Sequence, residues 1–415
     1  MVLQNDMEKI KIFTFGCKAN QYDSQVFREL LSRQGYEPVN ISYDIALINT
    51  CCVTKKAESE ARKLIRKLLK DGKRVWVTGC WVEKDDIISL FPDVKTLRRE
   101  QLYHEVRTFG IRGIENFYGH TRAFVKVVDG CENFCTYCIV PYVRGKIRSR
   151  QIDEIVEEIR KLINNGFREI VLTGIDLGSY GKDTGSDLTE LIQKISVIEG
   201  LARFRFSSIE MFYITDKLLE ILVRCKNFCP SFHVPLQSGS SRILGKMGRP
   251  YKYHEYKERL NRIKTVFPSA GFSTDIMVGF PGETEQDFEM SINAILECGF
   301  LKVHVFPFSP HSQTSASHLP GVVAEKTKKE RVLKMIEIAN SVSSGVKRSF
   351  VGKKNTVLIE RRVNEFWTGY TENYIPAMIR SEKNLCGVLI EIYPESTIKL
   401  ENMEYLCSEK FSILP

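Results

Sequence analysis

Three cysteines, Cys131, Cys135 and Cys138, lie in the run DGCENFCTYCIVPYVRG and form a C-x3-C-x2-C triad. Structural zinc is held by four protein ligands, whereas a cubic iron–sulfur cluster has four irons to ligate. Three thiolates in so short a run therefore indicate a 4Fe–4S cluster with one iron open to a small molecule. The alternative is a zinc knuckle or three unrelated thiols, but no fourth Cys or His lies nearby.

Another cysteine triad, which comes first in the chain, is expected before residue 118. Three runs there read as strands, at KIFTFG (11–16), DIALINT (44–50) and RVWVTG (74–79). Helices are expected between them at about 24–34 and 57–70. Strand–helix–strand alternation predicts a small parallel sheet. Cys17, Cys51 and Cys80 follow these strands at the carboxyl edge, where ligands gather in open α/β sheets, so they can converge. Cys52 is adjacent to Cys51, and either could be the ligand.

The rest of the chain divides into two further segments. The strand–helix unit repeats six times between about 119 and 350, with strands expected at 123–130, 169–174, 203–208, 231–237, 272–280 and 302–310. Six units are too few for an eight-fold barrel and predict a partial (βα)6 barrel with an open side. Residues 351–415 hold short strands and no strong helix, a pattern typical of a small β-barrel. The fold class is therefore α/β with three domains, at 9–118, 119–350 and 351–415.

The composition favours a cytoplasmic protein with a polyanionic partner. Twelve Cys in a chain of 415 residues more often bind metal than form disulfides. The polar start of the chain is unlike a secretion signal, and no apolar run could span a bilayer, so we expect no membrane partner. The net charge of +9 is compatible with nucleic acid. Basic residues exceed acidic ones in 1–118 (20 against 16) and 119–350 (32 against 26), but not in 351–415 (8 against 9).

One basic run is a candidate nucleic-acid footprint. It lies on a predicted helix at about 57–70 and just before it, and the alternative is a solvated helix face. Its members are Lys55, Lys56, Arg62, Lys63, Arg66 and Lys67.

Further motifs identify the chain as a member of a known family. The radical S-adenosylmethionine (SAM) methylthiotransferases have an N-terminal domain that GCKANQYDSQ (16–25), NTCCVT (49–54) and TGCWVE (78–83) resemble. Three further motifs resemble the radical SAM domain of this family: DGCENFCTYCIVPYVRGKIRSR (129–150), HVPLQSGS (233–240) and VGFPGET (278–284). The C-terminal segment is similar to a TRAM domain, an RNA-binding module. The resemblance covers essentially the whole chain.

Three branches of this family differ in substrate: isopentenyl-adenosine in tRNA, threonylcarbamoyl-adenosine in tRNA, or a ribosomal-protein aspartate. The motif GCKANQ differs from the GCQMN typical of the isopentenyl branch and the GCPKN typical of the ribosomal branch. LTGIDLGSYGKD (172–183) is similar to the threonylcarbamoyl branch and unlike the GQNVNSY of the isopentenyl branch. We therefore expect an enzyme that adds a 2-methylthio group to threonylcarbamoyl-adenosine in the tRNA anticodon loop.

The resemblance also implies cofactors. Cys131, Cys135 and Cys138 would hold one 4Fe–4S cluster that binds SAM and generates a deoxyadenosyl radical, which abstracts hydrogen from an adenine carbon. A second, auxiliary 4Fe–4S cluster would be held by Cys17, Cys51 and Cys80 and would carry the sulfur that another SAM methylates. The family's NTC motif uses its first cysteine, which favours Cys51 over Cys52. An electron donor and a sulfur donor are further partners, whose identity the sequence does not define.

Other residues are candidates for binding SAM or RNA. Tyr137, inside the triad, could pack near the SAM adenine or could simply pack its loop. Strand-end residues that could contact SAM, or instead act as turn and cap residues, are Thr173, Gly174, Ser208, Glu210, Gln237, Ser238, Val278 and Gly279. Arg144, Arg148 and Arg150 could meet phosphates. Radical abstraction needs no general base, so His233, His311 and His318 are interpreted as structural.

A different class of function is an RNA-binding protein whose clusters are structural or redox-sensing. Two three-cysteine sites argue against it, because each leaves an open coordination position that a structural cluster does not need.

Overall fold

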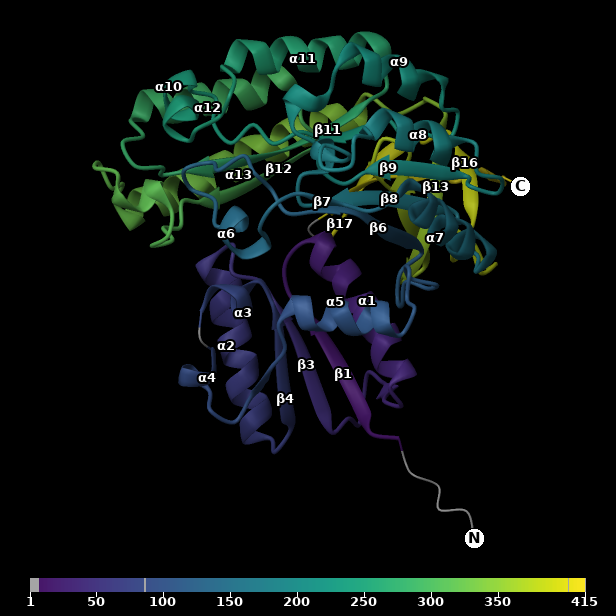
Figure 1. The fold of residues 1–415 in the computed structure, drawn as a ribbon. Helices are drawn as coiled ribbons and strands as arrows, with labels where there is room; N and C mark the ends of the chain where they lie inside the picture. Colours follow the sequence, from purple (N-terminus) through teal and green to yellow (C-terminus); the bar gives the residue numbers. More distant parts are fainter. Residues whose placement is uncertain (1–6, 86, 402, 415) are drawn as a thin grey trace.

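The computed structural model describes residues 7–85, 87–401 and 403–414, so the polar start at 1–6 lies outside the described residues. The lower layer in Figure 1 is a parallel sheet of order β2-β1-β3-β4-β5. Its strands are β1 (Lys9–Thr14), β2 (Glu37–Pro38), β3 (Ile45–Thr50), β4 (Arg74–Gly79) and β5 (Lys95–Thr96). Its helices are α1 (Lys18–Arg33), α2 (Lys55–Lys70), α3 (Cys80–Lys84), α4 (Ile87–Leu90) and α5 (Arg99–Thr108).

Helix α1 begins earlier than the apolar pattern predicts. Its first turns carry polar side chains that are nevertheless buried, including Asn20 and Asp23. A helix normally shows its buried face as a periodic apolar stripe, so this stretch gives no such signal. The polar burial is explained by the contacts that these side chains make at the candidate site.

The central segment forms an arc of six parallel strands, in chain order, with helices on its outer face (Figure 1). One sheet has the order β7-β6-β8-β9 and the other β10-β11-β12, and a bridge between Phe204 and Phe228 links the end of the first sheet to the segment before β10. The strands are β6 (Arg122–Asp129), the short antiparallel β7 (Arg148–Ser149), β8 (Glu169–Gly174), β9 (Arg203–Phe206), β10 (Ser231–His233), β11 (Gly271–Val278) and β12 (Lys302–Pro307). This arrangement is the expected partial barrel.

The helices of the central segment alternate with its strands. They are α6 (Val140–Arg144), α7 (Ile152–Asn164), α8 (Leu188–Ser196), α9 (Asp216–Arg224), α10 (Ser241–Lys246), α11 (Tyr253–Val266), α12 (Glu285–Cys298) and α13 (Glu325–Arg348), with 3-10 turns η1 (Leu177–Ser179), η2 (Met211–Tyr213) and η3 (Ser315–His318). Strand β10 is shorter than the predicted 231–237, because Pro235 has no N–H for a ladder and Gln237 has a φ of +73°.

The C-terminal segment is a mainly antiparallel sheet of order β17-β18-β15-β14-β13-β16-β19, with one parallel pair, β15 and β18. Its strands are β13 (Asn355–Val363), β14 (Phe366–Thr371), β15 (Pro376–Arg380), β16 (Leu389–Ile392), β17 (Ser396–Leu400), β18 (Met403–Ser408) and β19 (Phe411–Ile413). The sequence pattern does not predict β17 and β19, which have no fully buried residue and hence no clear apolar alternation.

Buried side chains run continuously from the lower sheet into the central arc. Val26 and Leu30 of α1 belong to the same core as Val125 of β6 and Ile159 of α7. The sheets fall within the three expected ranges, and a division at residues 118 and 350 stays a prediction. In the part of the chain that the structure describes, no helix combines the length and apolarity that a membrane crossing needs.

Candidate active site

The first cysteine triad lies at one edge of the lower sheet. Cys17, Cys51 and Cys80 follow β1, β3 and β4, which are neighbouring parallel strands. Gly16 packs directly on Cys51: a Cβ at Gly16 would lie 2.9 Å from the Cys51 Sγ, and the φ of +96° also favours glycine. Cys51 and Cys80 are buried and Cys17 is exposed, so the edge is open on the Cys17 side.

The side chain of Asn20 ties the three cysteine loops together. Its Nδ2 donates to the carbonyl oxygens of Phe15 at 2.8 Å and Thr50 at 3.0 Å, and its Oδ1 lies 4.0 Å from the Cys80 Sγ. Asn20 is fully buried, so these contacts replace water. The sequence analysis did not assign Asn20. The available signal was an Asn in the helix turn directly after a cysteine.

Arg144 connects the central arc to the first triad. It ends α6, the helix that follows Cys138, and its Nε donates to the Cys80 Sγ at 3.2 Å. Its Nη1 donates to Asp23 at 3.0 Å and to Asp129 at 3.1 and 3.2 Å. The guanidinium is buried, so it cannot reach a phosphate as the sequence analysis proposed. It places a fixed positive charge beside a thiol of the triad.

The side chain of Arg150 also bonds to other residues of the protein. Its Nη1 donates to Glu158 at 2.6 Å and to the Tyr22 hydroxyl at 2.9 Å. Of the three arginines expected to meet phosphates, only Arg148 is exposed.

The second cysteine triad lies in the loop after β6 and is fixed by backbone contacts. The Thr136 N–H donates to the Met247 carbonyl at 3.0 Å, and the Thr136 carbonyl accepts from the Ala316 N–H at 2.8 Å. The Cys138 N–H donates to the Cys135 carbonyl at 2.9 Å. The loop containing Cys131, Cys135 and Cys138 is therefore held between α10 and η3.

Arg249 links the second triad to a predicted SAM contact. Its Nη1 lies 3.4 Å from the Cys135 Sγ, and its guanidinium pairs with Glu210, after β9, and with the Tyr251 hydroxyl. Burial raises the pKa of Glu210, and the charge of Arg249 opposes that rise. The sequence analysis selected Glu210 but missed Arg249, because only the fold brings position 249 to the cysteine loop.

Asp176 forms a second polar group next to this loop. Its Oδ2 accepts from Asn133, between the cysteines, at 3.0 Å and from the Tyr213 hydroxyl at 3.1 Å. Its other oxygen, Asp176 Oδ1, is buried without a hydrogen-bond partner in the structure. Gln237 Oε1 is buried and unpartnered in the same way. Such orphaned acceptors fit a site that binds a polar ligand.

The remaining predicted SAM contacts divide by where their side chains lie. Tyr137 packs on a small apolar cluster that contains Ile243 and Met247. Ser238 is fully buried and bonds Ser291, so its hydroxyl faces α12. Five others stand at strand ends, and their contacts with SAM stay predictions: Thr173, Gly174, Ser208, Val278 and Gly279.

The two triads suit iron–sulfur clusters chemically. Burial raises the pKa of the Cys51, Cys131 and Cys138 thiols to about 12, so they hold their protons until a metal displaces them. Soft thiolate donors favour iron–sulfur clusters over hard cations. Cys52 is fully buried and its Sγ contacts the Cys80 carbonyl at 3.4 Å, which accounts for it as a packed thiol.

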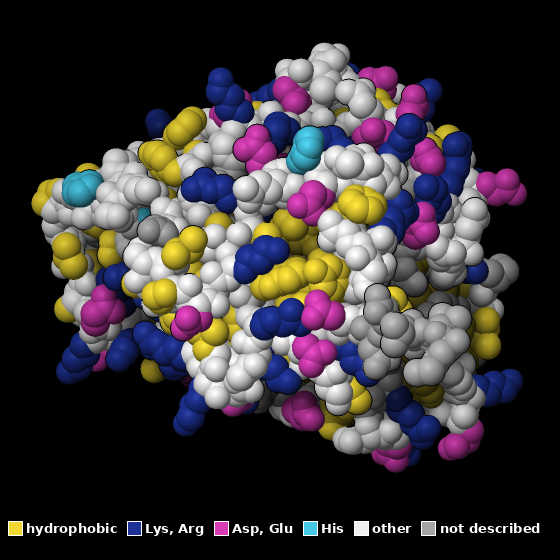
Figure 2. All heavy atoms as spheres, turned by 60° about the horizontal axis from the view of Figure 1, so that its bottom comes forward, with side chains coloured by type: hydrophobic (Ala, Val, Ile, Leu, Met, Phe, Trp, Pro, Cys, Tyr) yellow, Lys and Arg dark blue, Asp and Glu magenta, His cyan; other side chains and the backbone are white. Residues whose placement is uncertain are grey.

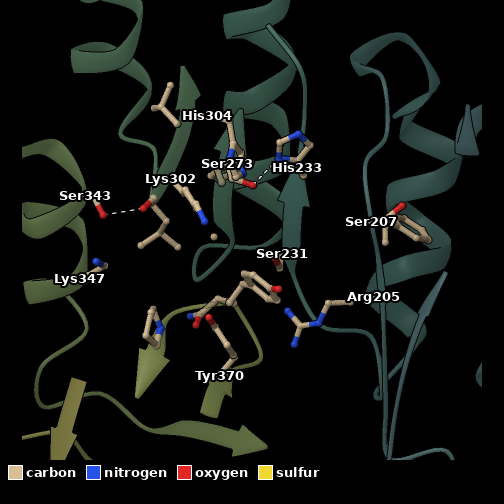
Figure 3. Close-up of a pocket in the computed structure, with 18 of the residues that line it drawn as sticks. Arg205, Ser207, Ser231, His233, Ser273, Lys302, His304, Ser343, Lys347 and Tyr370 are labelled. Atoms are coloured by element: carbon tan, nitrogen blue, oxygen red, sulfur yellow. Dashed lines mark hydrogen bonds between the residues drawn. The ribbon is translucent and has the colours of Figure 1, made fainter. Parts of the chain in front are cut away.

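A cavity of about 400 Å³ lies inside the arc (Figure 3). Strands β9 to β12 supply one wall, α13 another, and Tyr370, Asn373 and Tyr374 of the C-terminal segment the floor. Lys18, the residue directly after Cys17, also lines it. The cavity wall therefore includes the residue next to Cys17 in the chain, although none of the three cysteines lines it, and the sequence alone does not predict this cavity.

The three histidines named from the sequence have different surroundings. His311 is buried and contacts the Val53 carbonyl at 2.9 Å, and His318 contacts the Ser312 carbonyl at 3.2 Å. His233 instead faces the cavity, where it contacts Ser273 Oγ at 2.9 Å.

Comparisons with known proteins agree with this geometry. The profile of the radical SAM superfamily matches residues 125–295, which include the second triad, and that of Uncharacterized protein family UPF0004 matches residues 9–97, which include the first. The structure of the radical SAM methyltransferase TsrM from Kitasatospora setae has a TM-score of 0.55 at 13% identity, covering 75% of this chain and 77% of that one, a likeness of fold. The fold and the triad thus define a radical SAM enzyme.

Two relatives of known activity show which radical SAM enzymes this chain resembles. The chain is 35% identical over 395 residues to the threonylcarbamoyladenosine tRNA methylthiotransferase MtaB of Thermotoga maritima, covering 89% of this chain and 91% of that protein. It is 36% identical over 389 residues to the tRNA-2-methylthio-N(6)-dimethylallyladenosine synthase of Pelotomaculum thermopropionicum, covering 85% and 87%. The chain belongs to the radical SAM methylthiotransferase family. Membership implies a 4Fe–4S cluster and SAM.

Proposed function

We propose that this enzyme adds a methylthio group to C2 of threonylcarbamoyl-adenosine in the anticodon loop of tRNA. The observation that carries the proposal is that one helix, α6, runs from the second cysteine triad to Arg144, whose side chain reaches Cys80 of the first triad. Two three-cysteine sites linked in this way would suit a reaction that needs both a radical and a sulfur carrier. The names of the relatives supply the substrate class, tRNA, and hence a cytoplasmic location.

The residues that would hold the cofactors follow from the two triads. Cys131, Cys135 and Cys138 would bind the cluster that receives SAM, and the auxiliary cluster would be bound by Cys17, Cys51 and Cys80. When bound, these groups supply radical formation and the transferred sulfur.

The protein's own groups orient and enclose the reactants. Arg249 holds Glu210 at the mouth of the second triad, where the carboxylate can accept hydrogen bonds from a polar part of SAM. Asp176 Oδ1 and Gln237 Oε1 offer further buried acceptors. The cavity beside Lys18 would receive a base extruded from a single-stranded loop, which RNA loops allow at low cost.

Two surfaces are candidates for holding the rest of the tRNA. Helix α2 exposes several basic side chains, among them Lys55, Lys56, Lys63, Arg66 and Lys67. Figure 2 shows basic and acidic side chains interspersed over the face that it presents, so phosphate contacts there would be local rather than a continuous stripe. The C-terminal sheet would add contacts as an RNA-binding module.

Mass spectrometry of tRNA nucleosides from cells with and without the gene tests the proposal. We expect 2-methylthio-threonylcarbamoyl-adenosine to disappear on deletion and its unthiolated precursor to accumulate. Complementation with Cys135→Ser, which should not restore the product, links the loss to the cluster. Loss of the isopentenyl counterpart would instead assign the other tRNA branch, and no change in either nucleoside would direct the assay to the ribosomal-protein aspartate.

A further inference from the structure

The charged side chains that line the cavity inside the arc are all basic. Two histidines line it, His233 and His304, together with five cationic side chains: Lys18, Arg122, Arg205, Lys302 and Lys347. No Asp or Glu among the described residues belongs to its lining. A space enclosed in this way by one sign of charge attracts a ligand of the opposite sign.

The two arginines already have partners. Arg122 Nε is 2.6 Å from Glu360, and Arg205 Nε is 2.7 Å from Glu169, which is fully buried. Arg205 also donates to the Thr371 carbonyl at 3.2 Å. These guanidiniums fasten the C-terminal sheet to the floor of the arc, and their charge is largely neutralised.

The three lysines are different. Within the described ranges, no carboxylate lies within 4 Å of the amine of Lys18, Lys302 or Lys347, so none has an ion pair. Lys18 and Lys347 are partly buried, whereas Lys302 is exposed. Burial lowers the pKa of Lys347, and the carboxylate of Glu404 opposes that shift. A partly buried ammonium without a counter-charge is unfavourable unless a ligand supplies one.

Strand geometry directs Lys302 into the cavity. Residues two apart on a strand share a face, so Lys302 and His304 of β12 point the same way, while Val303 between them packs on the core. Lys347 comes from α13, which runs along this strand, and Figure 3 shows Lys302 and Lys347 at the same space as Tyr370 and Arg205. Burial lowers the pKa of Lys347 most, Glu404 raises it, and the nearby charge of Lys302 lowers it by a smaller amount.

We propose that Lys302 and Lys347, with Lys18 beside them, form an anion subsite that binds the carboxylate of the threonylcarbamoyl group. The inference rests on the proposed function and names the residues that would separate this base from isopentenyl-adenosine. The isopentenyl group is apolar and uncharged, so it would leave the three ammoniums without an ion-pair partner.

A divalent cation is the alternative ligand for the histidine side of the cavity. His233, Asp275 and His304 place potential ligand atoms within 4.8 Å of one another. Asp275 is already within 3.3 Å of His233 Nε2, and the lysines of the cavity repel a second positive charge. The carboxylate is therefore the occupant that the charges favour.

The test uses the reconstituted enzyme and anticodon stem-loop RNA that carries threonylcarbamoyl-adenosine either as the free acid or as its methyl ester. For the wild type we expect the KM of the ester RNA to exceed that of the acid by about tenfold or more, the usual worth of a charge-assisted hydrogen bond. The double variant Lys302→Gln/Lys347→Gln should raise the KM of the acid RNA by a similar factor, leave that of the ester RNA unchanged, and affect kcat less than KM.

Two matched variants accompany it. Lys329→Gln removes an exposed lysine from the same helix, α13, outside the cavity, and should leave both KM values unchanged. The variant Lys302→Arg/Lys347→Arg keeps the charge and should recover most of the discrimination between acid and ester.

The outcomes are separable. Equal wild-type KM values for acid and ester RNA overturn the anion subsite without using any variant, so a misfolded variant cannot obscure the result. A double variant that weakens both RNAs equally also overturns it. Wild-type activity on isopentenyl RNA, with none on either threonylcarbamoyl RNA, refutes the proposed function itself.

Discussion

Arg144→Met removes the charge and the donors of a side chain that is 2% exposed, while keeping an unbranched apolar stem. The guanidinium bonds Asp23, Asp129, Asn20 and Cys80, so it joins the lower sheet to the central arc. Removing one partner of a buried ion pair typically costs about 3–5 kcal/mol, because the remaining charge stays buried without compensation.

The lower end of that range applies to this site. Lys126 Nζ remains 2.9 Å from Asp129, and Arg99 Nη2 remains 3.3 Å from it. Two cations would then still face the carboxylates of Asp23 and Asp129, and no surplus negative charge would be left. We therefore expect the free energy of unfolding to fall by about 3 kcal/mol.

Urea unfolding of the cluster-free protein, followed by tryptophan fluorescence, measures this loss, since Trp76 and Trp81 both belong to the lower layer. Arg148→Met is the matched control, because Arg148 is exposed, and it should change stability by less than about 0.5 kcal/mol. If Arg144→Met costs no more than this control, the guanidinium does not stabilise the contact between the two layers.

Four further results are expected. Gly79→Ala should lower stability by about 1–3 kcal/mol in the same assay, because φ is +95° and the new Cβ would lie 2.4 Å from a backbone oxygen; an unchanged midpoint would contradict the close packing. Cys51→Ser should bind about half of the wild-type iron, whereas Cys52→Ser should keep it all, and the reverse pattern would reassign the ligand. Arg249→Gln should weaken SAM binding by about tenfold in equilibrium binding, and unaltered affinity would remove this residue from the site. Burial opposes ionisation of Asp129, but Lys126 and Arg144 lower its pKa well below the ordinary value. The stabilisation that the ionised carboxylate provides is therefore present above about pH 4 and lost as the pH falls below that. Asp129→Asn should accordingly reduce the loss of stability at acid pH, measured as the urea midpoint at each pH.

The strands that carry the cysteines could be predicted because their signals are local. β8 and β4 occupy the predicted 169–174 and 74–79, where an apolar run ends at glycine. The same short-range pattern located both cysteine triads. Residues that complete the site depend on pairs distant in sequence, such as Arg144 with Cys80 or Arg249 with Cys135, and a single sequence carries no signal for such pairs.

Buried polar residues account for most of the differences. Asn20 and Asp23 interrupt the apolar stripe of α1, so the helix start was placed too late. Lys302 and His304 alternate with Val303 and Val305 on β12, which correctly indicated a strand, but their exposed polar face lines a cavity that the alternation alone does not predict. The alternation of polar and apolar residues along a strand shows which residues share a face, but it does not show whether that face lies against solvent, a cavity or another domain.

Cys17 and Lys18 are consecutive, although Cys17 belongs to the triad that we propose carries the sulfur and Lys18 belongs to the cavity wall. The spacing between these two functions is therefore set by a single peptide unit, about 3.8 Å between Cα atoms, and not by how the layers dock. Loosening of the contact between the lower layer and the central arc would change how Cys17 and Lys18 are oriented toward the arc. The distance between their Cα atoms would stay constant. The covalent chain thus fixes the backbone spacing between the proposed sulfur-carrying site and the wall of the proposed base pocket.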